Sequence, residues 1–255
     1  MEQAFYAEYA QAEQNHWWFA ARRRILEGVL RKCLKPPAND RSVLEVGTGT
    51  GHLGQMLSRY GWFVGSDLNW TALEYAKHRL LRLVAARLEQ LPFSDAAFDA
   101  IFACDVLEHV RDDASALAEL RRVCHPKGCL ILTVPAFDWL WSPHDEINHH
   151  HRRYTRRRLS IALGQAGWRI QRMSYFNTFL FAPIALARLF SARHAGRARS
   201  DLARPIPHAL SRVLEAIFAS ERALLARWNL PIGVSLLAVA SPHEAAPDKT
   251  DDERF

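Results

Sequence analysis

The chain has 255 residues, of which 49% are hydrophobic, so it can bury a sizeable core in one large domain. Its four cysteines include no Cys-x-x-Cys pair, which argues against a disulfide framework and favours a reduced, cytoplasmic protein. The sequence opens without a basic segment followed by an apolar core, and no uncharged apolar run reaches about 18 residues. We therefore expect neither a signal peptide nor an ordinary transmembrane helix.

The net charge of +6 is unevenly distributed. Arginines cluster at Arg22–Arg24, in Arg152–Arg158 and between Arg188 and Arg204. Such a surface suits nucleic acid, anionic lipid or a phosphorylated substrate, and equally a basic surface without a special partner. Charge alone does not choose among them.

The pattern of elements predicts an α/β fold. Residues 2–32 are predicted to be helical, and Pro36 and Pro37 close this region. Strands and helices then alternate, which is typical of a parallel sheet covered on both faces. The predicted strands are Ser42–Val46, Trp62–Ser66, Leu83–Leu88, Ala100–Asp105, Cys129–Val134, Trp168–Tyr175 and Val234–Ala240. The predicted helices are His52–Tyr60, Thr71–Leu80, Asp113–Val123 and Thr155–Ala166.

A glycine-rich turn is the most informative segment of the chain. Residues 44–54 read LEVGTGTGHLG, at the expected junction of the first strand and its helix. Glycine is needed where backbone turns sharply or approaches a ligand closely. Twenty residues after Gly47, Asp67 ends a second apolar run, where a carboxylate can accept hydrogen bonds from the two hydroxyls of a ribose. Together the two signals predict a site for a nucleoside-containing cofactor.

The glycine spacing indicates which cofactor binds. A dinucleotide site uses Gly-x-Gly-x-x-Gly, whereas this chain has Gly-x-Gly-x-Gly preceded by Glu45, which would repel a pyrophosphate. A carboxylate there could instead attract an ammonium or a sulfonium through water. The segment resembles motif I of the class I S-adenosylmethionine-dependent methyltransferases. The resemblance implies a Rossmann-like, seven-stranded, mostly parallel sheet with S-adenosylmethionine as cofactor. The implied cofactor-binding residues are Glu45, Gly47, Thr48, Gly49, Gly51, Asp67, Leu68, Leu88, Glu89 and Asp105.

A second segment, Leu91–Asp99, is similar to the L-P-F-x-D-x-x-F-D run that follows the adenine-contacting loop in many of these enzymes. The usual acidic partner of adenine is replaced here by Arg87, so backbone atoms, Leu88 or Glu89 are the alternatives for that contact. The fourth strand then leads to Asp105, which is expected at the sheet's carboxyl edge near the methyl donor.

Two further segments resemble a subgroup of bacterial methyltransferases of types 11 and 23. One is H-W-W-F-x-x-R-R from His16 to Arg23, and the other is H-D…H-x-R-R-Y-T from His144 onward. Histidines and aromatic residues at the ligand edge suit an acceptor with an acidic hydroxyl, whose proton a neutral imidazole could remove. The candidate catalytic residues are His144, His150 and His109, and for His109 a helix-capping role is the alternative.

A metal site is an alternative to this metal-free interpretation. Ubiquinone-pathway O-methyltransferases and small-RNA 2′-O-methyltransferases carry a similar E-x-x-E-H run that binds a divalent ion. The matching residues are Asp105, Glu108 and His109, with His150 as a fourth ligand. This set would suit magnesium, manganese or zinc.

The region before the last strand departs from a minimal domain. Residues 177–230 are predicted to form a helical cap over the ligand edge or a docking surface. The apolar run Tyr175–Phe190 is too short to cross a bilayer, but it could lie on a membrane, line a tunnel for a lipid-like acceptor or pack on the sheet.

The predicted organisation has an N-terminal helical lid (1–37), a cofactor-binding α/β domain (38–176 and 231–242), the cap (177–230) and a disordered tail (243–255). The predicted activity is O-methylation of a small-molecule or lipid-like acceptor by a cytoplasmic enzyme, with peripheral membrane contact as an option. An RNA methyltransferase or a nicotinamide-dependent oxidoreductase is the alternative. Nucleic acid is not the expected partner, because no recognised binding motif accompanies the arginines.

Overall fold

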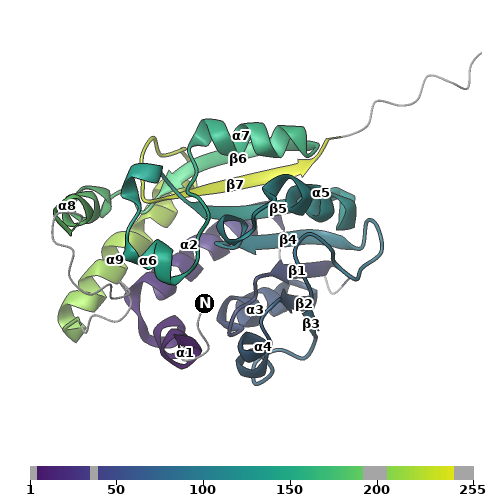
Figure 1. The fold of residues 1–255 in the computed structure, drawn as a ribbon, viewed down its shortest axis with the longest axis horizontal. Coiled ribbons are helices and arrows are strands. Elements are labelled where there is room, and N and C mark those ends of the chain that lie inside the picture. The colour runs from purple at the N-terminus through teal and green to yellow at the C-terminus, as the bar shows by residue number, and fades with distance from the viewer. Residues whose placement is uncertain (1–4, 35–39, 192–205, 244–255) are drawn as a thin grey trace, which may run out of the picture.

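The computed structural model describes residues 5–34, 40–191 and 206–243. Seven strands form one sheet, in the order β3-β2-β1-β4-β5-β7-β6 (Figure 1). Their bounds are β1 Ser42–Val46, β2 Trp62–Asp67, β3 Leu83–Ala85, β4 Phe98–Cys104, β5 Cys124–Pro135, β6 Trp168–Phe176 and β7 Ser235–Pro242. β7 is antiparallel to both neighbours, β5 and β6, and all other pairs are parallel. The predicted seven-stranded, mostly parallel sheet is confirmed.

The strand order reverses between β1 and β4, because β2 and β3 lie on one side of β1 while β4 and β5 lie on the other. Parallel α/β sheets bind ligands at the carboxyl ends of the strands beside such a reversal. The glycine turn after β1 and the turn after β4 both begin at this point. The sheet therefore places both sequence-predicted site segments together.

Helices cover both faces of the sheet because side chains alternate along its buried strands. Leu44 and Ile101 face the core beneath α5 (Asp113–Val123) and α7 (Arg156–Gln165). Val43 and Phe102 face the opposite core, which contains buried residues of four other α-helices. Those helices are α2 (Trp17–Cys33), α3 (His52–Leu57), α4 (Trp70–Ala76) and α9 (His208–Leu225). In the view of Figure 1, α5 and α7 lie in the upper part of the molecule, and α2, α3, α4 and α9 lie lower.

The N-terminal region, predicted to be helical, forms two helices. α1 runs from Phe5 to Asn15, and α2 begins at Trp17. Between them His16 has extended backbone, and its Nδ1 accepts a hydrogen bond from the Trp18 amide at 3.3 Å. The ring thus replaces the missing helical acceptor at the start of α2. This break allows α1 to turn over the glycine turn while α2 packs on the sheet.

The helical insertion before the last strand is confirmed as α8 (Phe181–Ser191) and α9, which packs against α2. Residues 192–205 lie outside the described residues, and so does the predicted disordered tail 243–255 apart from His243. The predicted helix His52–Tyr60 is α3 followed by the short helix η1 (Ser58–Tyr60). The prediction missed three short elements, η2 (Leu107–His109), η3 (Asp138–Leu140) and α6 (Pro143–Ile147). α6 has a capping box, in which Ser142 and Asp145 bond to each other's backbone.

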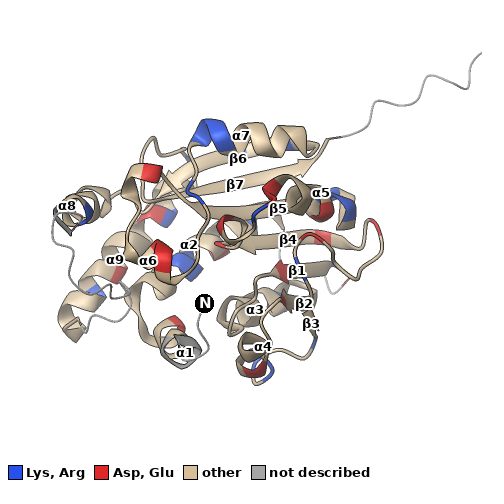
Figure 2. Cartoon of the chain, viewed as in Figure 1, with Lys and Arg blue, Asp and Glu red and all other residues tan. Residues whose placement is uncertain are grey.

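No helix in the described ranges has the length and apolar content needed to cross a membrane. The four cysteines, Cys33, Cys104, Cys124 and Cys129, are all free. In the view of Figure 2, Lys and Arg are interspersed with Asp and Glu, apart from a group at the start of α7.

Candidate active site

The glycine turn has the backbone that its sequence predicts. Gly47, Gly49 and Gly51 all have positive φ, at 66°, 56° and 88°. A Cβ at Gly47 would lie 2.7 Å from Cγ2 of Val106, on the turn after β4, so the two turns pack too closely for a side chain. Gly51 precedes α3, and a Cβ there would lie 3.2 Å from the Ala76 backbone. The glycines therefore allow the turn after β4 to pack on one side of the glycine turn and α4 to pack on the other.

Asp67, at the end of β2, fixes the neighbouring turn. Its Oδ2 accepts a hydrogen bond from the Gly49 amide at 2.9 Å, and its Oδ1 accepts one from the Asn69 amide at 2.9 Å. Burial raises the pKa of the carboxyl, while these backbone hydrogen bonds lower it. The Asp67 carboxylate lies between two turns at the carboxyl end of β2. It is well placed to accept hydrogen bonds from ribose hydroxyls in place of those from the two amides.

A cavity of about 510 Å³ lies along these turns. It is lined by Gly47 and Gly49 after β1, by Asp67 and Leu68 after β2, and by residues after β3 and β4. The latter are Ala86, Arg87, Leu88, Glu89, Asp105, Val106 and His109. This lining fits the three parts of S-adenosylmethionine. The Asp67 carboxylate suits the ribose, the glycine turn suits the methionine part, and the apolar Leu88 suits the adenine.

Three predicted cofactor residues, Glu45, Thr48 and Gly51, do not line this cavity. Glu45 points behind the turn, where the Thr48 hydroxyl donates to its Oε2 at 2.6 Å. Burial raises the pKa of Glu45 to about 8, so the carboxyl is neutral at physiological pH. The structure thus gives Glu45 no position from which its charge could attract a sulfonium. It supports the turn from within the core.

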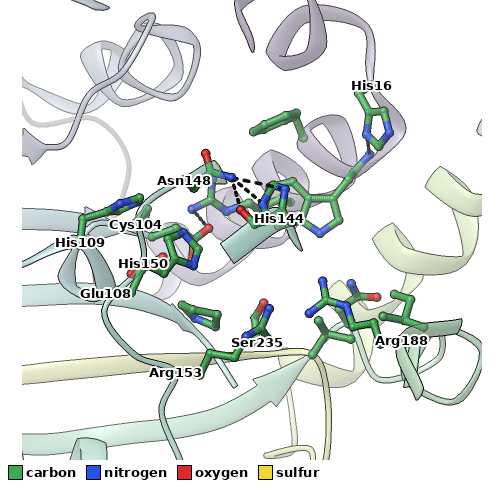
Figure 3. Close-up of a pocket in the computed structure, with 18 of the residues that line it drawn as sticks. His16, Cys104, Glu108, His109, His144, Asn148, His150, Arg153, Arg188 and Ser235 are labelled. Atoms are coloured by element: carbon green, nitrogen blue, oxygen red, sulfur yellow. Dashed lines mark hydrogen bonds and ion pairs between the residues drawn. The ribbon is translucent and has the colours of Figure 1, made fainter. Parts of the chain in front are cut away.

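A second cavity, of about 300 Å³, adjoins the first. Tyr9, Asp105 and His109 line both cavities, so these residues mark their junction. Most of the remaining lining comes from α2, the β5–α7 connection, α8 and the start of β7. Figure 3 shows lining residues of this cavity in close-up. It combines apolar residues (Trp18, Phe19, Ile184, Ala187, Val234) with polar ones (Arg22, Glu108, His144, Asn148, His150, Arg153, Asn177, Arg188).

Asp105 at the junction is held by α2. Nη2 of Arg22 lies 2.5 Å from Oδ2 of Asp105, and the Thr133 hydroxyl donates to Oδ1 at 3.0 Å. The Trp18 ring covers the guanidinium, 5.0 Å from Cζ to the ring centroid. Burial alone would lower the pKa of Arg22, but the Asp105 carboxylate raises it above its ordinary value. These contacts explain why the H-W-W-F-x-x-R-R segment belongs to the site.

The turn after β4 carries a buried acid and a buried imidazole. Glu108 is 1% exposed, and neither of its carboxyl oxygens has a hydrogen-bond partner. Burial, with Asp105 nearby, raises its pKa well above the ordinary value. Burial and the neighbouring His150 lower the pKa of His109 to about 3, so its ring is neutral. The His109 and His150 rings meet edge to face, with centroids 4.6 Å apart.

The H-D…H-x-R-R-Y-T segment converges on Asp145. Oδ1 of Asp145 accepts from Nδ1 of His150 at 2.8 Å, and Arg153 donates to both of its oxygens at 2.9 and 2.8 Å. Burial raises the pKa of Asp145, but the hydrogen bonds from His150 and Arg153 lower it well below its ordinary value. When Nδ1 of His150 donates to Asp145, the second ring nitrogen, Nε2, is the one left to contact a ligand in the cavity.

The three predicted catalytic histidines, His109, His144 and His150, all line the second cavity. His144 lies on α6, and its ring centroid is 6.2 Å from that of His150. Among the alternative metal ligands, Glu108, His109 and His150 come together, whereas Asp105 is engaged by Arg22 and does not join them.

Sequence reasoning missed several lining residues. Tyr9, Arg22, Asn148, Arg153 and Arg188 were not predicted as site residues, although all of them line the second cavity. The resembling segments at His16–Arg23 and His144–Thr155 contain three of them, so those segments were the available signal. Tyr9 and Arg188 lie outside both segments and had none.

Comparison with known proteins agrees with this geometry. Residues 44–132 match a family described as a methyltransferase domain. The ubiquinone/menaquinone biosynthesis C-methyltransferase of Hahella chejuensis is 35% identical over 103 residues, which cover 36% of this chain and 41% of that protein. The malonyl-(acyl-carrier protein) O-methyltransferase of Legionella pneumophila is 33% identical over 101 residues, covering 36% of this chain and 36% of that protein. The chain thus spans less than half the length of these curated relatives.

A solved structure resembles the whole fold. A possible histamine N-methyltransferase from Thermotoga maritima superposes with a TM-score of 0.60 at 18% identity, covering 95% of this chain and 97% of that one. At this identity the likeness shows the fold alone. The names of the three similar proteins specify transfer to carbon, oxygen and nitrogen, so they do not define an acceptor atom.

Proposed function

Because the chain contains a methyltransferase domain with the class I, S-adenosylmethionine-dependent fold, we propose that it methylates an oxygen atom of a small-molecule or lipid-like acceptor. The observation that carries this proposal is the junction of two cavities at Tyr9, Asp105 and His109. A cofactor in the larger cavity and an acceptor in the smaller one would meet there. Such an arrangement aligns two reactants without any covalent enzyme intermediate.

The cofactor cavity assigns a task to each turn. When bound, S-adenosylmethionine supplies a methyl group carried on a positively charged sulfur. After the transfer, this sulfur remains in the neutral thioether that is the leaving group. Asp67 would accept hydrogen bonds from the ribose, and Leu88 with Glu89 would flank the adenine. The glycine turn would admit the methionine part, since Gly47 and Gly49 carry no side chain into the cavity.

The acceptor cavity supports transfer to oxygen. His144 and His150 line it, and a neutral imidazole can take the proton that a hydroxyl loses as its oxygen gains the methyl group. Trp18, Phe19 and Ile184 give the cavity an apolar wall suited to a hydrocarbon or an aromatic ring. The sheet edge, α2 and α8 enclose the transfer, which limits competing attack by water.

The two alternatives lose support. The relatives are methyltransferases, and the Gly-x-Gly-x-Gly spacing does not suit the dinucleotide of an oxidoreductase. RNA is the less favoured acceptor, because no recognised nucleic-acid-binding motif accompanies the arginines.

Calorimetry with S-adenosylmethionine tests the cofactor assignment. Replacement of Asp67 by Ala should weaken binding by about 1–3 kcal/mol, because two ribose hydrogen bonds lose their acceptor. Asp95→Asn is the control, since that carboxylate is exposed and pairs with Arg122 away from the cavity. Unchanged affinity in the Asp67 variant would contradict the assignment.

Product analysis tests the acceptor class. The protein is incubated with methyl-labelled cofactor and an extract containing the acceptor, and labelled products are identified by mass spectrometry. We expect label on an oxygen of a small or lipid-like molecule. Label on nitrogen, on carbon or on RNA would overturn that part of the proposal.

A further inference from the structure

The buried carboxylate of Glu108 is the feature of the acceptor cavity that the methyl transfer leaves unexplained. Both of its oxygens are inaccessible to solvent, and neither has a hydrogen-bond partner. A buried polar group without a partner is costly, and such groups in native proteins call for a specific reason. Arg22 is not that partner, because its guanidinium binds Asp105 and Thr133.

Two imidazoles lie where a cation beside Glu108 would need ligands. One ligand atom each from Glu108, His109 and His150 lies within 4.8 Å of the other two. Figure 3 shows these three side chains grouped at one end of the cavity, with His144 farther along it. On a tetrahedral ion with bonds of about 2.0–2.1 Å, ligand atoms lie roughly 3.3 Å apart, so small side-chain rotations would close the set.

The surroundings hold the ligands in orientation. Asp145 accepts from Nδ1 of His150, which leaves Nε2 to bind a cation, and a carboxylate in this role is usual behind a metal-binding histidine. The bidentate contact with Arg153 fixes the orientation of the Asp145 carboxyl group. In addition, the His151 amide donates to the Glu108 carbonyl at 2.8 Å, which ties the His150 segment to the turn after β4.

We propose that Glu108, His109 and His150 bind one divalent transition-metal ion of the zinc type at the acceptor end of the cavity junction. Two imidazoles and one carboxylate favour such an ion over magnesium or calcium, which prefer oxygen ligands. Three protein ligands leave a coordination position open, as in catalytic zinc sites. Because all three ligands line the acceptor cavity, an acceptor bound there could reach that position.

The ion would also divide the roles of the three histidines, a step that rests on the proposed function. An acceptor oxygen bound to the ion loses its proton more easily, since a bound cation lowers the pKa of a coordinated hydroxyl. His109 and His150 are then ligands, and His144 is the imidazole that receives the proton. The acceptor class narrows to molecules whose reacting hydroxyl can approach a cation.

Direct binding to the full chain tests the site without reference to activity. Chelator-treated protein is titrated with Zn²⁺ by calorimetry, and bound metal is counted after dialysis. We expect one ion per chain. Glu108→Gln and His150→Gln should each weaken binding at least tenfold, because each removes one of three ligands while nearly preserving size.

Two controls use neighbouring histidines. His144→Gln lies in the same cavity and should leave zinc affinity within about twofold. The double variant His149→Gln/His151→Gln tests adventitious binding by the histidine run and should also have no effect. Substoichiometric binding by the native chain, or loss of binding in the double variant, would overturn the proposal.

Cofactor titration separates this proposal from the proposed function. Glu108 does not line the cofactor cavity, so Glu108→Gln should bind S-adenosylmethionine normally, which also shows that the variant is folded. Normal cofactor binding with no metal binding by the native chain would reject the ion alone. Loss of cofactor binding in Asp67→Ala bears only on the methyltransferase site.

Discussion

At the residue scale, Glu45 shows how one carboxyl can serve a site from inside the core. Sequence spacing places it two residues before Gly47, as if it faced the ligand. In the structure it is 2% exposed and accepts a hydrogen bond from Thr48, which is part of the glycine turn. The protonated carboxyl group therefore supports the turn through this hydrogen bond without carrying a charge. Its contribution to the free energy of unfolding should depend on pH.

The free energy of unfolding should fall as pH rises, because of Glu45. Burial raises its folded-state pKa from 4.5 to about 8, so in this window the folded chain keeps a proton that the unfolded chain releases. Each unit of pKa difference costs about 1.4 kcal/mol. Glu45→Gln should flatten the fall between about pH 5.5 and 8, measured by urea unfolding at several pH values.

Glu119→Gln provides the control of opposite sign. The hydrogen bond from Arg122 lowers the pKa of Glu119, so this carboxylate stabilises the fold above its ordinary pKa and loses that effect in acid. Its replacement should leave the slope near neutral pH intact. An equal slope in the native chain and in Glu45→Gln would show that Glu45 does not titrate in this window.

At the element scale, the connection from β5 to α7 is organised around one buried ion pair. Arg153 is 2% exposed and Asp145 is fully buried, and their bidentate contact joins α6 to the segment leading into α7. Arg153 also donates to the Ala136 carbonyl at 3.1 Å, just after β5. The pair therefore shapes the wall of the acceptor cavity.

A double-mutant cycle should reveal strong coupling between Asp145 and Arg153. Arg153→Met should destabilise the fold by about 3–5 kcal/mol, because it leaves a buried charge without its partner. Combining it with Asp145→Asn should cost less than the sum of the single changes, as measured by urea unfolding. The exposed pair Glu27–Arg31 on α2 is the control, with coupling of at most about 0.5 kcal/mol. Equal coupling in the two pairs would contradict a structural role for Asp145–Arg153.

The elements also show how far the sequence leads. The alternation of strand and helix patterns along the chain, with the glycine-rich turn, predicts the parallel sheet. The observed bounds of α5, Asp113–Val123, match the prediction. The break at His16 is not predicted, because an imidazole replaces the common capping residues there. α6 has only five residues and its position depends on Asp145, which bonds to residues from outside the helix. Likewise, the pairing of Arg22 with Asp105 joins residues far apart in sequence, and no local pattern encodes it.

At the scale of the whole molecule, α8 connects the acceptor cavity to the surface. Ile184, Ala187 and Arg188 line the cavity, whereas Leu186 and Leu189, about half a turn away around the helix, are 54% and 53% exposed. Figure 1 shows α8 at the outer edge of the molecule, away from α3 and α4. Exposed apolar side chains on a helix that lines the cavity, in a protein of net charge +6, suit contact with an anionic lipid surface that supplies a lipid-like acceptor.

Flotation with vesicles containing an anionic phospholipid tests this contact. The native chain should float with the vesicles at low salt, and Leu186→Glu/Leu189→Glu should reduce the bound fraction at least about tenfold, because inserting each leucine contributes roughly 1.5–3 kcal/mol. Leu81→Glu is the matched control, since Leu81 is 95% exposed in the connection between α4 and β3. If the native chain fails to float, or if Leu81→Glu lowers binding equally, α8 is not a membrane contact. The acceptor would then have to reach the cavity from solution, which favours a small molecule over a lipid.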